Sequence, residues 1–351
     1  MAEKGRVCVT GAGGYVASWL VKLLLSKGYM VHGTVRDPSD EKNAHLEKLE
    51  KAPENLELFK ANLLDYDSLC AAITGCDGVF HVASPVPSSK LSNPEAIIPH
   101  SKSVELVEPA VKGTLNVLKA CSEAKVKRVV VVSSGAAVSM NPNWPKDQVK
   151  DETCWSDKDY CRETKNWYSV AKTEAESGAF EYANRSELNV VSVCPTLVIG
   201  PMLQSTVNAT SLVLIKLIKG GWEAFGSRAR MIVDVRDVVE ALLLAYEKSE
   251  AEGRYICASY LSTAQDLVEK LRTMYPSYNY PKKYSHTKMC NTLFPNLFVC
   301  VFFVCSFAEV EEEVKVSSEK LQRLGWRYRP LEETLADAVK NYQEAGVLDK
   351  N

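Results

Sequence analysis

The amino-acid sequence predicts an α/β fold built on a parallel β-sheet with helices on both faces. Through the first two-thirds of the chain, short runs rich in β-branched residues alternate with segments of helical periodicity. The runs are apolar throughout, as is typical of strands that are buried on both faces. A glycine-rich turn links the first run to the first helical segment. These three features together predict a doubly wound sheet.

The predicted elements follow one another in a regular order. The first strand, "RVCVT" at 6–10, leads into a helix at 17–28 that ends on a glycine. Later in the chain, residues 230–249 are expected to form a short strand that feeds a helix, and 253–258 a further strand. The remaining strands are expected at 30–35, 56–61, 78–83, 128–134 and 189–194.

Composition and charge narrow the class of protein. The 351 residues carry a formal net charge of −2 and are 46% hydrophobic, which is typical of an ordinary soluble globular protein. There is no dense run of lysine and arginine of the kind that binds nucleic acid or an anionic membrane. The first strand begins so close to the N-terminus that no room is left for a signal peptide, so we expect a cytoplasmic protein.

The eleven cysteines follow no spacing that is typical of metal ligands or of a disulfide framework. We therefore expect no metal site and mostly buried free thiols. Cys154 and Cys161 are near enough in sequence to approach each other, but in a reducing compartment we expect thiols there as well.

The glycine-rich turn "VTGAGGYVASW" has the form of a phosphate-binding loop. Gly11, Gly13 and Gly14 permit a tight turn and a close approach of the backbone to a pyrophosphate. The helix that follows offers free N–H groups and the positive end of its dipole. Ala17 stands where a third glycine often lies, and it is small enough for close helix–strand packing. Because the turn lies between the first strand and the first helix, it predicts a dinucleotide site.

The end of the second strand predicts which dinucleotide binds. An acidic side chain there would bind the ribose 2′-hydroxyl of NAD, but the strand is followed by Arg36. A guanidinium suits a 2′-phosphate, and Lys42 adds a second positive charge. NADP(H) is therefore the expected cofactor. The alternative is that Arg36 merely forms a surface ion pair with Asp37 or Asp40.

Four side chains are candidates for chemistry. The strand that ends in "VVVVSSGAAV" places Ser133 and Ser134 at the carboxyl edge of the sheet, where parallel sheets bind ligands. Tyr168 and Lys172 lie four residues apart on the next major helix and share one face. An unperturbed phenol has a pKa of about 10. A neighbouring ammonium and the positive nicotinamide of NADP⁺ both favour the phenolate, so we expect a lowered pKa for Tyr168.

Motifs along nearly the whole chain carry a family resemblance. They are "VTGAGGYVASWLVKLLL", "GTVRDP", "GVFHVASPV", "EPAVKGTLNVLKAC", "KRVVVVSS", "ETCWSD", "KNWYSVAKTEAE", "CPTLVIGP" and "VDVRDV". With them the chain resembles the extended short-chain dehydrogenase/reductases, and within these the plant cinnamoyl-CoA reductase and dihydroflavonol reductase group. The resemblance implies an NADP-binding Rossmann domain from 1–195 with about 230–258, and a small C-terminal substrate lobe from 196–229 and 259–351.

The resemblance also implies roles for single residues. Aligning "SSGAAV" on the family motif makes Ser134 the catalytic serine, beside Tyr168 as proton donor and Lys172, which would also bind the nicotinamide ribose. Asn62 stands where the family has an acidic residue near the adenine, and its side-chain oxygen can still accept a hydrogen bond there. The other implied cofactor-binding positions are Tyr15, Val16, Leu63, Ala83, Pro195 and Val198.

The substrate signature differs from that of cinnamoyl-CoA reductases themselves, whose "KNWYCYGK" is replaced by "KNWYSVAK". The family's histidine and arginine associated with the CoA ester fall on Val213 and Ala264, and only Lys216 is kept. The resemblance therefore implies an NADPH-dependent reductase of a small aromatic, cinnamaldehyde-like aldehyde.

Three alternatives stay open. The chain could be a cinnamoyl-CoA reductase that acts on hydroxycinnamoyl-CoA thioesters. It could be an epimerase or dehydratase of the same family, although Arg36 argues against this class. It could also be a catalytically silent NADP-binding sensor or scaffold, a class that usually loses the tyrosine or the lysine. Either a monomer or a homodimer is expected.

Two stretches look foreign to the family, "AIIPHSKS" at 96–103 and a segment from about 285 to 307. One hypothesis is that they are gene-model additions, and the alternative is a divergent but real loop. The dense apolar run at 297–307 falls short of the roughly 20 residues that a bilayer span requires, which argues against a membrane anchor.

Overall fold

The computed structural model describes residues 4–84, 106–220, 229–281 and 315–349. The two stretches that look foreign to the family, 96–103 and 285–307, lie outside these residues. The insertion hypothesis therefore stays a prediction.

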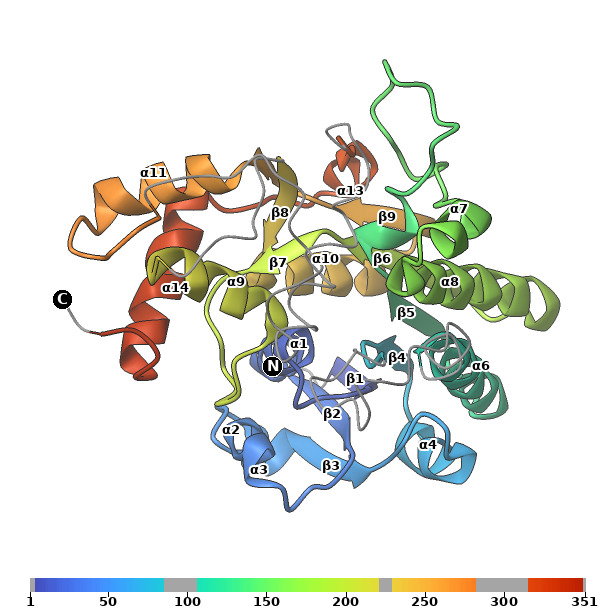
Figure 1. Ribbon diagram of the computed structural model, residues 1–351. Helices are drawn as coiled ribbons and strands as arrows, with labels where there is room; N and C mark the ends of the chain where they lie inside the picture. Colours follow the sequence, from blue (N-terminus) through green and yellow to red (C-terminus); the bar gives the residue numbers. More distant parts are fainter. Residues whose placement is uncertain (1–3, 85–105, 221–228, 282–314, 350–351) are drawn as a thin grey trace, which may run out of the picture.

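The centre of the molecule is a seven-stranded sheet in the order β3-β2-β1-β4-β5-β6-β9 (Figure 1). Every neighbouring pair in it is parallel. The strand order reverses direction between β1 and β4, which is where doubly wound sheets bind ligands. The predicted Rossmann-type α/β fold is thus confirmed. The strands are β1 (Lys4–Val9), β2 (Tyr29–Val35), β3 (Leu56–Lys60), β4 (Gly78–His81), β5 (Arg128–Val132), β6 (Val190–Pro195) and β9 (Gly253–Cys257).

Helices cover both faces of this sheet, and each face has its own hydrophobic core. Val7 and Val9 of β1 pack into one core while Cys8 between them packs into the other. This alternation explains why the strands are apolar throughout, since neither set of side chains meets water. One face carries α1 (Tyr15–Ser26) and α10 (Val235–Glu247), and the other carries α4 (Tyr66–Ile73), α6 (Glu108–Glu123) and α8 (Trp167–Ser186) (Figure 1).

Local sequence sets where these helices begin. Asp65, Asn166 and Asp234 each cap a helix by accepting a hydrogen bond from a first-turn N–H, for α4, α8 and α10 respectively. Helix α1 differs, because Gly14 precedes it, no side chain caps it, and its first turn carries no acidic residue. The start of α1 is therefore the one of these four that suits an anion.

A smaller lobe follows the main sheet. Its three-stranded sheet has the order β10-β8-β7, and β8 pairs with β7 and β10. The short strand predicted within 230–249 thus lies in this second sheet as β8, while α10 and β9 lie with the main one. The domain bounds stay a prediction. The elements of this part are β7 (Leu197–Ile199), α9 (Ala209–Ile218), β8 (Arg230–Asp234), β10 (Tyr260–Ser262), α11 (Ala264–Met274) and α14 (Leu331–Glu344).

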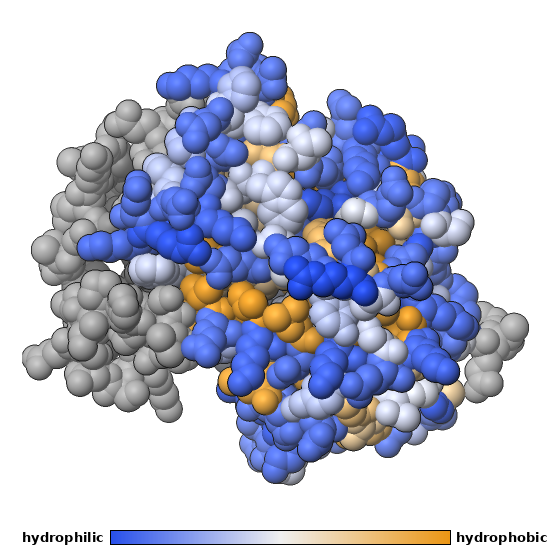
Figure 2. Space-filling view, turned by 90° about the vertical axis from the view of Figure 1, so that its right-hand side faces the viewer, coloured by the Kyte–Doolittle hydropathy of each residue, from blue (hydrophilic) through white to orange (hydrophobic). Residues whose placement is uncertain are grey.

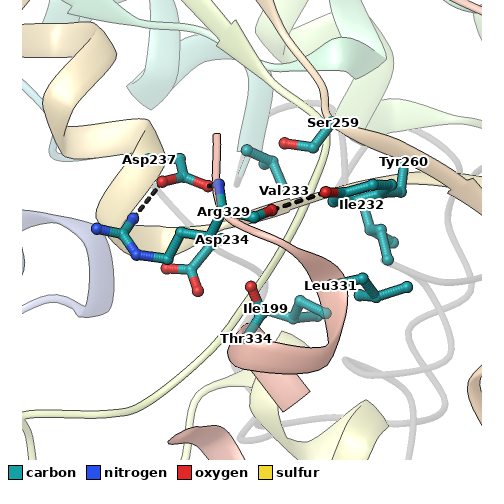
Figure 3. Close-up of a pocket in the computed structure, with 10 residues that line it drawn as sticks. All are labelled: Ile199, Ile232, Val233, Asp234, Asp237, Ser259, Tyr260, Arg329, Leu331 and Thr334. Atoms are coloured by element: carbon teal, nitrogen blue, oxygen red, sulfur yellow. Dashed lines mark hydrogen bonds and ion pairs between the residues drawn. The ribbon is translucent and has the colours of Figure 1, made fainter. Parts of the chain in front are cut away.

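The lobe joins the main domain through a tightly packed polar contact (Figure 3). Arg329 forms an ion pair with the buried Asp237 of α10, and Tyr260 donates its hydroxyl to the Arg329 carbonyl at 2.8 Å. The small void that these residues line with Ile199 and Thr334 is too tight to admit a water molecule. It is therefore a packed joint and not a ligand site.

The face that carries α6 and α8 is mostly hydrophilic with an apolar band across its middle (Figure 2). Among helices in the described ranges, none combines the length and apolar character needed to cross a membrane. Short helical elements also occur in the described chain. They are η1 (Glu41–Asn43), α2 (Ala44–Glu47), α3 (Ala52–Asn55), η3 (Gly135–Ala137), α7 (Lys158–Glu163) and α13 (Glu319–Arg323).

Candidate active site

The glycine-rich loop is packed so closely that only backbone fits. Gly11 has φ +68°, and a Cβ there would lie 3.0 Å from the Cβ of Ala83, two residues after the end of β4. A Cβ on Gly13 would collide with the side-chain oxygen of Asn43. The Gly11 N–H donates to Thr34 Oγ1 at 3.0 Å, which holds the loop against β2. The loop thus has the shape that lets main-chain N–H groups approach a pyrophosphate.

Tyr15 and Val16 open helix α1 directly after this loop. The Tyr15 hydroxyl donates to the Gly200 carbonyl at 3.0 Å, and the Tyr342 hydroxyl donates to the same oxygen at 3.0 Å. The phenol of Tyr15 therefore ties the loop to the C-terminal lobe. A phosphate at this helix start would be met by main-chain N–H groups and not by that hydroxyl.

Arg36 follows β2 at the carboxyl edge of the sheet and is exposed. Within the described part of the chain it forms no ion pair, so the predicted alternative of a surface pair with Asp37 or Asp40 is not found. Lys42 instead pairs with Asp40, and its hydrogen bond lowers the pKa of that carboxyl group. Arg36 is therefore free to meet a 2′-phosphate, whereas Lys42 would have to exchange its partner.

The segment after β3 is held beside helix α6. Asn62 accepts a hydrogen bond from the Leu64 N–H at 3.0 Å, which leaves one lone pair of its side-chain oxygen for another donor. Leu63 lies against Gly113, where a Cβ would come within 2.9 Å of the leucine Cβ, and its carbonyl accepts from Asn116 at 2.9 Å. The predicted adenine-side residues thus have a fixed backbone.

The predicted catalytic residues lie together at the carboxyl end of β5. Tyr168 and Lys172 are buried on α8, with the lysine Nζ 6.0 Å from the centre of the tyrosine ring. Ser134 is hydrogen-bonded to the Tyr168 side chain, and Lys172 donates to the Val132 carbonyl at 3.4 Å. Pro195 at the end of β6 lies beside this point, since a Cβ on Gly135 would be 3.6 Å from its carbonyl oxygen. The buried Val198 follows on β7.

Burial dominates the ionisation of this pair. It raises the pKa of Tyr168 to about 12, and the hydrogen bond with Ser134 works in the opposite direction. Burial also lowers the pKa of Lys172 to about 8, although the negative charge of Glu176 acts to raise it. The expected lowering of the tyrosine pKa is therefore wrong for the protein chain by itself, because desolvation disfavours the phenolate. Tyr168 is protonated at neutral pH, as a proton donor must be.

Sequence reasoning missed a buried histidine next to this site. Thr10 Oγ1 accepts from the N–H groups of Val82 and Ala83, so its own hydrogen goes to Nδ1 of His81 at 3.0 Å. His81 Nε2 then donates to Thr114 at 3.1 Å. Burial lowers the pKa of His81 to about 3, so the ring is neutral. The polar residue inside the apolar run "GVFHVA" was the available signal.

It also missed the buried pair of Glu176 and Arg254. Their closest contact is 2.9 Å, between the arginine Nε and one carboxylate oxygen. Glu176 lies one helical turn beyond Lys172, so the spacing in "YSVAKTEAE" already placed it on the face of Tyr168. Nothing in the sequence pairs it with Arg254.

The cysteines of the described residues are all free thiols, as expected. Cys154 packs with Val138 and Cys194, whereas Cys161 packs with Met140 and Val170 in a separate hydrophobic cluster. These two cysteines are therefore not paired.

Comparison with known proteins adds a family. Residues 7–258 match the "NAD dependent epimerase/dehydratase family". A Petunia hybrida protein named cinnamoyl-CoA reductase 1 is 46% identical over 97% of this chain and 93% of its own length. The crystal structure of vestitone reductase from alfalfa is 31% identical, with a TM-score of 0.78 over 98% of this chain and 100% of that one. A Candida albicans Gre2 structure in complex with NADPH is 25% identical, with a TM-score of 0.76 over 97% and 99%.

The matched region runs from the first strand of the main sheet to the end of β9 and includes the glycine loop, the strand-end serines and α8. The chain therefore belongs to the NAD dependent epimerase/dehydratase family.

Proposed function

We propose that the chain is an NADPH-dependent oxidoreductase that reduces the carbonyl group of an aromatic, phenylpropanoid-type substrate, and that this substrate is a free cinnamaldehyde-like aldehyde. The observation that carries the proposal is the meeting of Ser134, Tyr168 and Lys172 at the carboxyl end of β5. The reductase names of the similar proteins support the same chemistry.

The described residues fit NADP(H). The loop at Gly11 and Gly13 leaves room for backbone alone, and α1 begins without a side-chain cap. Arg36 is exposed and has no ion pair with any residue that the structure describes. These features would hold the pyrophosphate and the 2′-phosphate, with Asn62 near the adenine. When bound, NADPH supplies the hydride for the carbonyl carbon.

The protein's own part in the reaction is to hold the carbonyl and deliver a proton. Tyr168 donates its proton to the developing alkoxide, and Ser134 donates a hydrogen bond to the same oxygen. The charge of Lys172 stabilises the phenolate that is left behind. Because burial keeps the phenol protonated, Tyr168 is a proton donor throughout the neutral pH range.

The free aldehyde is favoured over the thioester by what replaces the family's CoA-associated residues. Val213 and Ala264 both lie in the hydrophobic cluster of the lobe and are 2% exposed, so neither offers a polar atom to a phosphate. Lys216 alone is kept. The second candidate is a hydroxycinnamoyl-CoA thioester, which the name of the 46% identical relative favours.

NADPH oxidation with coniferaldehyde, feruloyl-CoA and a dihydroflavonol tests this proposal. We expect the highest kcat/KM with coniferaldehyde, because a small apolar aldehyde needs no cationic partners. A higher value with feruloyl-CoA would establish the thioester reductase. NADPH binding without turnover on any of the three would contradict the proposal and leave the sensor or scaffold and the epimerase or dehydratase as alternatives. We also propose that the protein is cytoplasmic and that it is a monomer or a homodimer.

A further inference from the structure

The buried face of α8 continues for one turn beyond the proposed catalytic pair. Tyr168, Lys172 and Glu176 are spaced by four residues each and so lie on one side of the helix. Glu176 is 1% exposed, which is exceptional for a carboxylate unless it is fully paired.

The carboxylate of Glu176 is bound from three strands. It accepts from Ser133 at 2.7 Å after β5, from Ser192 at 2.5 Å on β6, and from Arg254 at 2.9 and 3.1 Å on β9. Ser133 directly precedes Ser134. One side chain thus ties the helix of Tyr168 and Lys172 to the strand end that carries the serine.

Arg254 is in turn fixed in place and has no freedom to leave Glu176. Its guanidinium donates to the carbonyls of Glu152, Cys154 and Ala137, and it stacks 3.5 Å from the ring of Trp155. The pair is neutral as a whole, and its negative member, Glu176, lies one helical turn from Lys172 on the same side of α8.

Few other groups around Lys172 carry charge. His81 on β4 is neutral, the Cys194 thiol on β6 has a raised pKa, and Tyr168 on the same helix is protonated. Of the groups in the described chain that shift the pKa of Lys172, Glu176 is the only carboxylate, and it opposes the effect of burial.

We propose that Glu176, held by Arg254, is a positioning residue of the reductase site that aligns the Ser134 strand end with α8 and supplies the negative charge that keeps Lys172 protonated. The proposal rests on the reductase function above. It separates Glu176 from an ordinary structural ion pair, because a purely structural pair would not influence how the site responds to pH.

The first test is the pH dependence of kcat for wild type and Glu176→Gln. Glutamine keeps the size of the side chain and removes its charge, so the alkaline limb of kcat should move down by about one pH unit. The matched control is Ser133→Ala, which removes one hydrogen bond to the same carboxylate and leaves the charge. It should lower kcat by less than about tenfold and leave the limb in place. An unmoved limb in Glu176→Gln, or an equal shift in both variants, would overturn the proposal.

Glu176→Gln leaves Arg254 buried without its partner and could fail to fold for that reason. The double variant Glu176→Gln/Arg254→Met removes both charges, a change that buried pairs often tolerate. Its test is urea unfolding of the unliganded protein against pH. The pKa of Lys172 is lower in the folded than in the unfolded chain, so this residue makes stability rise with pH from about 8 upward.

In the double variant this rise should begin about one pH unit lower than in wild type, and Lys172→Met should abolish it. The same onset in both proteins would contradict the charge role of Glu176. This measurement needs neither substrate nor cofactor. A wild type that shows the rise but oxidises no NADPH would therefore refute the reductase and leave the charge role standing.

Discussion

Two consecutive stretches of helix α8 bury charged side chains in opposite ways. Among the described residues, Lys172 makes a single hydrogen bond, of 3.4 Å to a carbonyl, and burial lowers its pKa to about 8. One turn later, Glu176 accepts bonds of 2.5–3.1 Å from two serines and an arginine. A charge that is held without an ion pair costs stability, and such groups gather at functional sites. A fully bonded pair instead costs little, and in the proposal above it positions the site. The contrast distinguishes the residue at the chemistry from the residue that supports it within one helix.

The largest expected effect removes the proton donor and nothing else. Tyr168→Phe should lower kcat by roughly 100- to 10,000-fold, the usual contribution of a general acid. NADPH affinity, followed by fluorescence titration, should stay within about threefold, because only one oxygen is lost. A variant that keeps more than about half of the wild-type kcat would remove Tyr168 from the chemistry.

The second prediction concerns the buried pair of Glu176 and Arg254. Arg254→Met leaves the Glu176 carboxylate buried and unpaired, so the free energy of unfolding should fall by about 3–5 kcal/mol. Urea unfolding at pH 7 measures the loss. Glu176→Gln/Arg254→Met is the matched control and should recover most of it. Equal destabilisation of both variants would mean that packing, and not charge, holds this part of the molecule.

The third prediction concerns Lys172, one helical turn before Glu176, where removal of a charge should raise the free energy of unfolding. Lys172→Met should abolish turnover yet raise the free energy of unfolding at pH 7 by about 3 kcal/mol, because a desolvated charge is removed. In wild type the stability cost of Lys172 is fully present below about pH 8 and disappears as pH rises to the unfolded value. The gain should therefore vanish near pH 10.5. Destabilisation at pH 7 would show that the ammonium is well paired.

The smallest effect concerns an exposed charge. Arg36→Ala should weaken NADPH binding and leave NADH binding nearly unchanged, so that the preference falls by roughly ten- to a hundredfold. The KM values for NADPH and NADH measure this preference. Lys42→Ala is the matched control and should lower the preference less, because Lys42 already forms an ion pair with Asp40. Equal losses for NADPH and NADH in Arg36→Ala would mean that this residue does not contact the 2′-phosphate.

Much of the fold could be predicted because its signals are local. The main strands are continuous apolar runs, and Gly11 and Gly13 mark a turn that admits backbone alone. The strands β7 and β10 were missed because three residues are too short for a periodic pattern.

Some residues of the candidate site could likewise be predicted from local sequence, and others could not. Tyr168 and Lys172 are visible as a helical spacing, and Arg36 as a position at a strand end. The pairing of Glu176 with Arg254 joins residues 78 positions apart, so only the tertiary fold reveals it. The direction of the Tyr168 pKa shift also depends on burial, which the motif does not state.

The most direct test of the reductase follows the hydride itself. NADPH carrying deuterium at nicotinamide C4 on the transferred face is incubated with the protein and coniferaldehyde, and the product is analysed by mass spectrometry and NMR. We expect one deuterium on the carbinol carbon of the alcohol, and a rate of deuterium transfer that is roughly 100- to 10,000-fold lower with Tyr168→Phe at the same protein concentration. Coniferaldehyde recovered unchanged, with the deuterium still on the cofactor, would contradict the reduction of a free cinnamaldehyde by this chain.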